Sequence, residues 1–223
     1  MKLALLLSGG KDSLYAGYLA KKHSHKIACL ISIVSLNKES YIFHTPSVSQ
    51  TEKQAKAMNI SIIVQKTKGK KELELADLED AINLAKTKYK IEGVITGAIQ
   101  SVYQSSRIQK ICNKLKIECF NPLWQTDEEE YLKELIKNKF KVIIAGVFAY
   151  PLNQSWLGKQ INNKFIKEIK KLHEKYKISI IGEGGEFETF VLDCPLFKKP
   201  LQVKSFKDAK EGENSWRREL EIK

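Results

Sequence analysis

The chain begins with a short apolar run that leads directly into a glycine turn. Residues 2–7 have the sequence KLALLL, residues 8–13 have the sequence SGGKDS, and a helix-forming stretch follows. An unbroken apolar run of this length is typical of a buried parallel strand. A strand, a glycine turn and a helix form an anion-binding arrangement, because the first turn of a helix leaves backbone N–H groups unpaired. This opening stretch therefore predicts a phosphate-binding turn at the end of the first strand.

The side chains of this turn suit a phosphate ligand. Gly9 and Gly10 let the backbone approach phosphate oxygens, since neither has a Cβ atom. Ser8 and Ser13 add hydroxyl donors, and Lys11 adds a positive charge. A plain Gly-Gly turn between a strand and a helix is the alternative interpretation.

Asp12 separates this turn from other phosphate-binding motifs. It follows the lysine directly, where a Walker loop has Ser or Thr, and Leu5 stands where that loop has its first glycine. A Rossmann fingerprint would need a third glycine at a spacing that the chain lacks. Asp12 could cap the helix, or hold a Mg²⁺ ion that shares the phosphates.

The turn resembles the pyrophosphate loop of the ATP pyrophosphatases, in the adenine nucleotide alpha-hydrolase superfamily. That resemblance implies an ATP held by its β- and γ-phosphates, with the α-phosphate open to attack.

Predicted strands and helices alternate through the first half of the chain. The expected strands are residues 2–7, 26–34, 60–64, 93–97 and 117–120. This pattern predicts an α/β fold with a parallel, five-stranded, Rossmann-like (HUP-type) sheet that carries helices on both faces. Ligands of such sheets bind at the carboxyl ends of the strands. His44, after the second strand, and Gly97, at the end of the fourth, belong to that edge.

Pro122 interrupts the alternation, and we expect a second region to begin there. The predicted division is an ATP-binding domain over residues 1–121 and a smaller, substrate-binding α/β domain over residues 122–223. In the second region we expect helices at 127–137 and 162–176, and strands at 142–148, 178–181 and 190–192. The polar tail after Lys207 is expected to fray, although Trp216 indicates that it docks somewhere.

Arg107 stands out because this chain uses lysine for nearly all of its positive charge. Only three of its 38 Lys and Arg residues are arginine, and no other arginine precedes residue 217. A guanidinium group offers a planar, bidentate fork that an ammonium group lacks. Tyr103 lies four residues earlier and shares its helix face. We interpret the pair as a nucleotide or substrate clamp, with a surface ion pair as the alternative.

The segment GEGGEFET, residues 182–189, concentrates three carboxylates between two predicted strands. Glu183, Glu186 and Glu188 would repel one another, and a metal or a positively charged substrate would relieve that repulsion. A solvated acidic loop is the alternative. Trp124 and Trp156 occupy loop-like stretches near proline and glycine, where core packing and ligand stacking both remain open.

Composition narrows the class of protein. No apolar run approaches the roughly 20 residues of a membrane span, and the N-terminus does not resemble a signal peptide, so we expect a cytoplasmic protein without membrane association. The four cysteines form no CxxC pair, and the four histidines show no zinc spacing. The net charge of +12 could attract RNA or an acidic protein. Whether the protein forms a homo-oligomer remains open.

Several motifs together resemble the diphthine–ammonia ligase family in its short archaeal form. They are SGGKDS, GAIQSVYQSSR, NPLW, SWLG and GEGGEFETFVLDCP, spread from residue 8 to residue 197. The resemblance implies that ATP activates the carboxylate of diphthine on translation elongation factor 2, and that ammonia replaces AMP to give an amide, AMP and pyrophosphate. Free ammonia is expected because the chain shows no Cys–His pair typical of a glutaminase.

The resemblance and the residue patterns together assign roles to named positions. The expected catalytic residues are Lys11, Asp12, Arg107, Glu183 and Glu186. The expected nucleotide-binding residues are Ser8, Gly9, Gly10, Lys11, Asp12, Ser13, His44, Gly97 and Tyr103, with Asp12 as the Mg²⁺ ligand. The expected substrate-binding residues are Trp124, Trp156, Glu183, Glu186, Glu188 and Thr189.

Two other functions compete with this one. A tRNA-modifying pyrophosphate-loop enzyme would fit the positive charge, but the chain has no CxxC pair and no RNA-binding appendage, so we expect no nucleic-acid substrate. A module that senses ATP or AMP without chemistry is opposed by the intact Lys11 and Asp12 and by the glutamate-rich segment.

Overall fold

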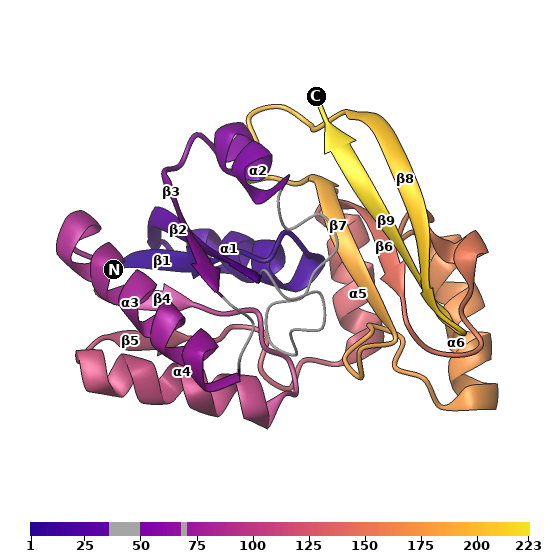
Figure 1. The fold of residues 1–223 in the computed structure, drawn as a ribbon, viewed down its shortest axis with the longest axis horizontal. Helices are drawn as coiled ribbons and strands as arrows, with labels where there is room; N and C mark the ends of the chain where they lie inside the picture. Colours follow the sequence, from indigo (N-terminus) through magenta and orange to yellow (C-terminus); the bar gives the residue numbers. More distant parts are fainter. Residues whose placement is uncertain (36–49, 68–70) are drawn as a thin grey trace.

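Five parallel strands form the first sheet, in the order β3-β2-β1-β4-β5 (Figure 1). The structure is a computed structural model, and it describes residues 1–35, 50–67 and 71–223. All four neighbouring pairs of strands are parallel, which confirms the predicted sheet. The chain reverses its direction of travel across the sheet between β1 and β4, so the carboxyl end of β1 lies where such folds bind ligands. The strands are β1 (Lys2–Leu6), β2 (Lys26–Ser35), β3 (Ile62–Thr67), β4 (Gly93–Ile95) and β5 (Glu118–Phe120).

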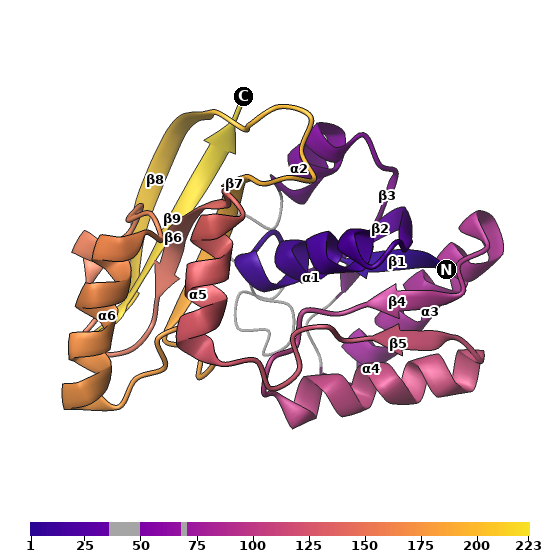
Figure 2. The same cartoon turned by 180° about the vertical axis from the view of Figure 1, so that it is seen from behind.

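Helices cover both faces of this sheet (Figure 2). One face packs on α1 (Lys11–Lys22) through Leu3, Leu5 and their neighbours. The other face packs on α3 (Lys71–Tyr89) and α4 (Val102–Leu115). The short helix α2 (Thr51–Met58) precedes β3. Because both faces are covered, the strands are apolar on both sides, which explains the unbroken apolar runs in the sequence.

A second, antiparallel sheet of four strands follows, in the order β7-β6-β9-β8. Helix α5 (Glu128–Lys137) leads into β6, and α6 (Asn163–Tyr176) precedes β7. Asp127 caps α5 and Asn162 caps α6, each with a side-chain oxygen that accepts backbone N–H groups. The remaining elements are β6 (Lys141–Val147), η2 (Gln154–Trp156), β7 (Phe187–Asp193), β8 (Val203–Gly212) and β9 (Ser215–Ile222).

The strand predicted for residues 178–181 is wrong. This segment is an irregular turn, although Ile178, Ile180 and Ile181 are buried in the core as the apolar pattern requires. Its backbone N–H groups bind carboxylates instead of a neighbouring strand. The N–H of Ser179 donates to Glu186 Oε1 over 2.7 Å, and that of Ile180 donates to Glu128 Oε2 over 3.2 Å.

The expectation that the tail frays is also wrong. Strands β8 and β9 form a hairpin, and β9 pairs with β6, so that Trp216 lies opposite Val147. The tail is polar because β8 is an edge strand, and its residues are exposed almost throughout. An exposed edge that carries lysine is a common protection against pairing with other chains.

The two sheets share a continuous hydrophobic core. Leu3 and Leu14 of the first part belong to the same buried cluster as Leu132 and Val191 of the second. The division of the chain at residues 121 and 122 stays a prediction. Within the described ranges, no helix combines the length and the apolar character that a membrane crossing requires.

Candidate active site

The turn of residues 8–13 lies at the carboxyl end of β1 and opens α1. Gly9 adopts φ +90°, and Gly10 is the N-cap of α1 without any side-chain cap. The two serines close the turn, since Ser8 Oγ lies 3.2 Å from Ser13 Oγ, and Ser13 Oγ donates to the Gly10 carbonyl over 3.1 Å. A positive φ favours glycine, which accounts for Gly9. The turn thus has the geometry of a phosphate loop that the sequence predicted, and we call residues 8–13 the loop.

Gly97 lies against the loop from the side of β4. A Cβ atom at this position would sit 2.6 Å from the carbonyl carbon of Asp12 and 2.7 Å from the amide nitrogen of Ser13. Only a glycine allows the two backbones to approach this closely. Gly97 therefore shapes the loop through its lack of a side chain. His44, which the sequence assigns to the same edge, lies outside the described residues.

Strand β7 of the second sheet covers the loop from the opposite side. The N–H of Val191 donates to the Gly9 carbonyl over 3.0 Å, and the N–H of Lys11 donates to Thr189 Oγ1 over 3.1 Å. The buried Gln54 of α2 joins the two parts, because its Nε2 donates to the carbonyls of Gly9 and Val191 over 3.0 and 2.9 Å. The hydroxyl of Thr189 thus binds the backbone of the loop, whereas the sequence predicted a substrate-binding role for this residue.

Lys11 and Asp12 of the loop form an ion pair. Lys11 Nζ lies 3.0 Å from Asp12 Oδ1 and 3.1 Å from Oδ2. The Lys11 side chain is only 5% exposed, whereas that of Asp12 is 34% exposed. The rings of Tyr131 and Phe187 flank the ammonium group, with centroids 6.0 and 5.8 Å from Nζ. The loop therefore presents the Asp12 carboxylate to solvent and keeps the lysine charge inside.

Tyr131, on the buried face of α5, completes this group. Its hydroxyl donates to Asp12 Oδ1 over 2.8 Å, and its side chain is almost fully buried. Burial raises the pKa of Tyr131 well above its ordinary value, and the charge of Asp12 adds to this shift. Sequence reasoning missed Tyr131 as well as Gln54. Tyr131 lies on an apolar helix face, where its pattern is that of an ordinary core aromatic.

The three glutamates of residues 183–188 have different partners. Glu183 Oε1 accepts the N–H of Gln100 over 3.0 Å, and Glu186 binds Ser179 as described above. Glu188 and Arg217 both pair with Gly146 of β6, and burial raises the pKa of Glu188 to about 8. Among the residues that the structure describes, no three His, Cys, Asp or Glu side chains come together in a way that suits a metal ion.

A groove of about 1050 Å³ is lined by part of the glutamate-rich segment. Glu183 and Glu186 belong to its wall, and Oε2 of Glu186 is buried there without a hydrogen-bond partner. Burial raises the pKa of Glu183, and the charge of nearby Asp12 raises it further, against the lowering effect of the Gln100 N–H. The groove therefore reaches the neighbourhood of Asp12. Its other walls come from the starts of α4 and α5, from α6 and from the turn after it: Gln100, Ser101, Gln125–Glu129, Lys170, His173, Lys177–Ile180 and Gly184.

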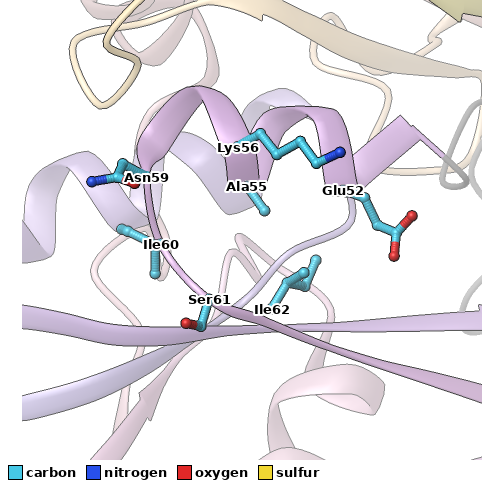
Figure 3. A pocket seen from close by; sticks show the side chains of 7 residues that line it. All are labelled: Glu52, Ala55, Lys56, Asn59, Ile60, Ser61 and Ile62. Atoms are coloured by element: carbon cyan, nitrogen blue, oxygen red, sulfur yellow. The ribbon is translucent and has the colours of Figure 1, made fainter.

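A second hollow, of about 380 Å³, lies between α2 and β3 (Figure 3). Glu52, Lys56, Asn59 and Ser61 are its polar residues. None of the residues that the sequence assigned to a site lines this hollow, and it shares no residue with the loop. We therefore place the candidate site at the loop and the groove.

Arg107 and Tyr103 share a helix face, as predicted. The guanidinium carbon of Arg107 lies 3.3 Å from the centroid of the Tyr103 ring, and Nη1 donates to the Tyr103 carbonyl over 3.3 Å. Among the described residues, no hydrogen bond or ion pair joins Arg107 to the loop. A role for this pair as a clamp stays a prediction.

The two tryptophans differ in their surroundings. Trp156 is 8% exposed, its ring meets that of Phe165 edge-on at 5.6 Å, and Lys159 Nζ lies 4.0 Å from its ring centroid. Trp124 is 37% exposed, in the turn between β5 and α5. Of the two, Trp124 is the one that solvent or a ligand can reach.

Comparison with known proteins places these features in a family. Residues 1–119 match the diphthamide synthase N-terminal domain, and residues 127–222 match the diphthamide synthase C-terminal domain. The chain belongs to the diphthamide synthase family. The two matched segments together contain the loop, Gly97, Tyr131 and the glutamate-rich segment.

Curated relatives carry the name diphthine–ammonia ligase. The mouse protein is 34% identical over 92% of this chain and 84% of its own length, and the human protein is 33% identical over the same shares. The protein of Saccharomyces cerevisiae is 31% identical over 89% of this chain, but over only 34% of its own length. Among solved structures, a predicted subunit of tRNA methyltransferase from Methanocaldococcus jannaschii aligns with a TM-score of 0.46 at 20% identity, over 90% of this chain and 99% of its own.

Proposed function

We propose that this protein is an ATP-dependent diphthine–ammonia ligase. Its reaction activates the carboxylate of diphthine on translation elongation factor 2 with ATP, and ammonia then replaces AMP, so that the products are an amide, AMP and pyrophosphate. The observation that carries the proposal is the Lys11–Asp12 pair at the start of α1, where the N-cap residue is Gly10 and Thr189 of β7 binds the Lys11 N–H. Family membership and the names of the curated relatives support it.

The loop fits the phosphates of ATP. Gly10 leaves the N-terminus of α1 without a side-chain cap, and helix N-termini favour anions. The exposed Ser8 and the half-buried Asp12 are the side chains of the loop that a nucleotide can reach. Lys11 lies next to them and would neutralise phosphate charge from within the protein. With no cluster of carboxylates among the described residues, a Mg²⁺ ion would be bound by Asp12 together with phosphate oxygens and water.

We assign the groove to the protein substrate. Its wall carries Glu183 and Glu186, and the charge of Asp12 acts on Glu183. Diphthine carries a trimethylammonium group, which calls for negative or aromatic groups on the enzyme. The carboxylates of Glu183 and Glu186 would attract that charge, and the partly exposed Trp124, in the turn between β5 and α5, could cover it. Free ammonia would enter from the same side, and a carboxylate would accept its proton.

The test is pyrophosphate release from ATP and ammonium by the purified chain. Release should require elongation factor 2 that carries diphthine, and it should not occur with unmodified elongation factor 2. The Glu186→Gln variant should bind ATP with nearly unchanged affinity and form much less amide. Release with bulk tRNA instead would favour a tRNA-modifying enzyme, and tight ATP binding without any release would favour a sensing module. Either outcome would contradict the proposal.

A further inference from the structure

We propose that Tyr131 is a positioning residue, which holds the Asp12 carboxylate where the metal–phosphate end of ATP binds. The inference rests on the proposed function and adds a residue from the second part of the chain to the nucleotide site. It follows from the hydrogen bond between the two side chains, whose residues are 119 positions apart. Neither the loop motif nor the glutamate-rich segment contains Tyr131.

The geometry fixes one oxygen of the carboxylate. Asp12 Oδ1 receives the Tyr131 hydroxyl over 2.8 Å and lies 3.0 Å from Lys11 Nζ. Lys11 alone could hold the carboxylate in several rotamers, because an ammonium group is a point charge on a flexible stem. The phenol is held rigidly, since it is buried and packs against the Tyr15 ring at a centroid distance of 5.4 Å, tilted by 54°. The Asp12 side chain is about one-third exposed, so it could otherwise rotate. A rigid hydrogen-bond donor restricts the rotamers of this carboxylate and so preorganises it for a ligand.

The chemistry of the donor also matters. A phenol donates a hydrogen bond without adding a charge, so the carboxylate stays available for a cation. A second ammonium or guanidinium in the place of Tyr131 would neutralise Asp12 and compete with Mg²⁺. Tyr131 thus directs the carboxylate without reducing its attraction for a metal ion. In addition, Tyr131 connects α5 to the loop, so the second part of the chain helps to form the nucleotide site.

The same aromatic cluster supplies a matched control. Tyr18 lies 5.7 Å from Tyr15, and its hydroxyl donates to Asn138 Oδ1 over 2.7 Å, away from Asp12. Tyr131→Phe and Tyr18→Phe each remove one phenolic hydroxyl and keep the ring. Both variants should fold, because Phe fills the same space and the Asp12 carboxylate keeps contact with solvent. Circular dichroism and unfolding midpoints check this.

The decisive experiment is calorimetric titration with ATP in the presence of Mg²⁺ and, separately, in EDTA. With Mg²⁺ we expect Tyr131→Phe to weaken ATP binding about 5- to 10-fold, and Tyr18→Phe to change it less than about 2-fold. In EDTA the two variants should bind ATP alike. In an Asp12→Ala background, Tyr131→Phe should add no further loss, because its effect acts through Asp12.

Each other outcome overturns the inference. Equal losses with Mg²⁺ and in EDTA, or an undiminished loss in the Asp12→Ala background, would give Tyr131 a purely structural role. Unchanged binding by Tyr131→Phe, or the same loss in Tyr18→Phe, would remove any specific role. If the unmodified chain fails to bind ATP at all, this result contradicts the proposed function, and the inference that rests on it is contradicted as well. The two failures are therefore distinguishable.

Discussion

The two sheets contribute to the site in different ways. The parallel sheet supplies the loop at the end of β1 and the close contact of Gly97 behind it. The antiparallel sheet and its helix α5 supply no phosphate loop, but Thr189 and Tyr131 reach the loop from there. The first sheet thus provides the groups that would touch the nucleotide, and the second holds those groups in position. In the proposed function, the catalytic unit would therefore be the pair of sheets.

The largest expected effect concerns the lysine of the loop. Lys11→Met keeps a long apolar stem in the buried site and removes the charge, so the fold should survive. We expect pyrophosphate release to fall about 100- to 1000-fold, since one fixed donor to developing charge is worth that much. The exposed Lys21, on the same helix, serves as the control, and Lys21→Met should release pyrophosphate normally. Normal turnover by Lys11→Met would mean that the first sheet does not supply the reactive group.

The same contrast between the sheets decides what the sequence could predict of the fold. All five parallel strands were predicted, because strands buried on both faces are continuous apolar runs between glycine and polar turns. The antiparallel sheet lacks that signal. Strand β8 is exposed almost throughout and resembles a polar tail, whereas residues 178–181 are apolar and yet form no strand. In the first sheet, the buried apolar residues are also the ones that pair as strands. In the second sheet, the exposed residues of β8 pair as a strand, whereas the buried residues 178–181 do not.

The site was predictable only where it is local in the chain. The loop is six consecutive residues, and its motif indicated its position directly. The partners of the loop lie far away, with Gln54 at 45 residues, Tyr131 at 119 and Thr189 at 178. A single sequence cannot show which distant side chains meet. The glutamates of residues 183–188 show the converse, since neighbours in the sequence have different partners in space: Glu183 binds the N–H of Gln100, and Glu186 that of Ser179.

The next prediction concerns a buried carboxylate of the second sheet. Burial raises the pKa of Glu188 to about 8, with Arg217 of β9 opposing this shift and Glu211 of β8 adding to it. Between about pH 4.5 and pH 8 the folded chain keeps a proton that the unfolded chain has lost, so stability should fall as pH rises through this window and level off above it. A shift of this size corresponds to about 5 kcal/mol at most.

Urea unfolding at several pH values measures this contribution. Glu188→Gln cannot lose a proton, so this variant should lose that part of the pH dependence and gain stability relative to the unmodified chain above pH 8. Glu219→Gln, at an exposed position of β9, is the control and should keep the original profile. An identical pH profile in Glu188→Gln would show that the buried carboxylate is ionised in the folded protein.

A smaller effect is expected from backbone crowding in the first sheet. Gly97→Ala would bring a Cβ atom within 2.6 Å of the Asp12 backbone, which cannot move without shifting the loop. We expect a loss of about 1–3 kcal/mol in unfolding free energy, with weaker ATP binding. Gly212→Ala in the second sheet is the control, because its Cβ atom would meet only Ser215 Cβ, at an ordinary 3.4 Å. Equal stability of the two variants would show that the contact with the loop is not tight.

The smallest expected effect is that of Thr189→Val, which tests whether Thr189 acts on the nucleotide or on the protein substrate. Thr189→Val has the same shape but no acceptor, so the buried N–H of Lys11 would lose its partner at a cost of about 1–2 kcal/mol. Because that N–H belongs to the loop, we expect ATP affinity to fall about 5-fold, while the ratio of amide formed to pyrophosphate released stays constant. Thr189→Ser keeps the oxygen and should restore ATP affinity. Calorimetry and a coupled assay for both products separate the possibilities. Unchanged ATP affinity with a lower yield of amide would return Thr189 to the substrate side, where the sequence analysis had placed it. The second sheet would then touch the substrate directly instead of acting through the loop.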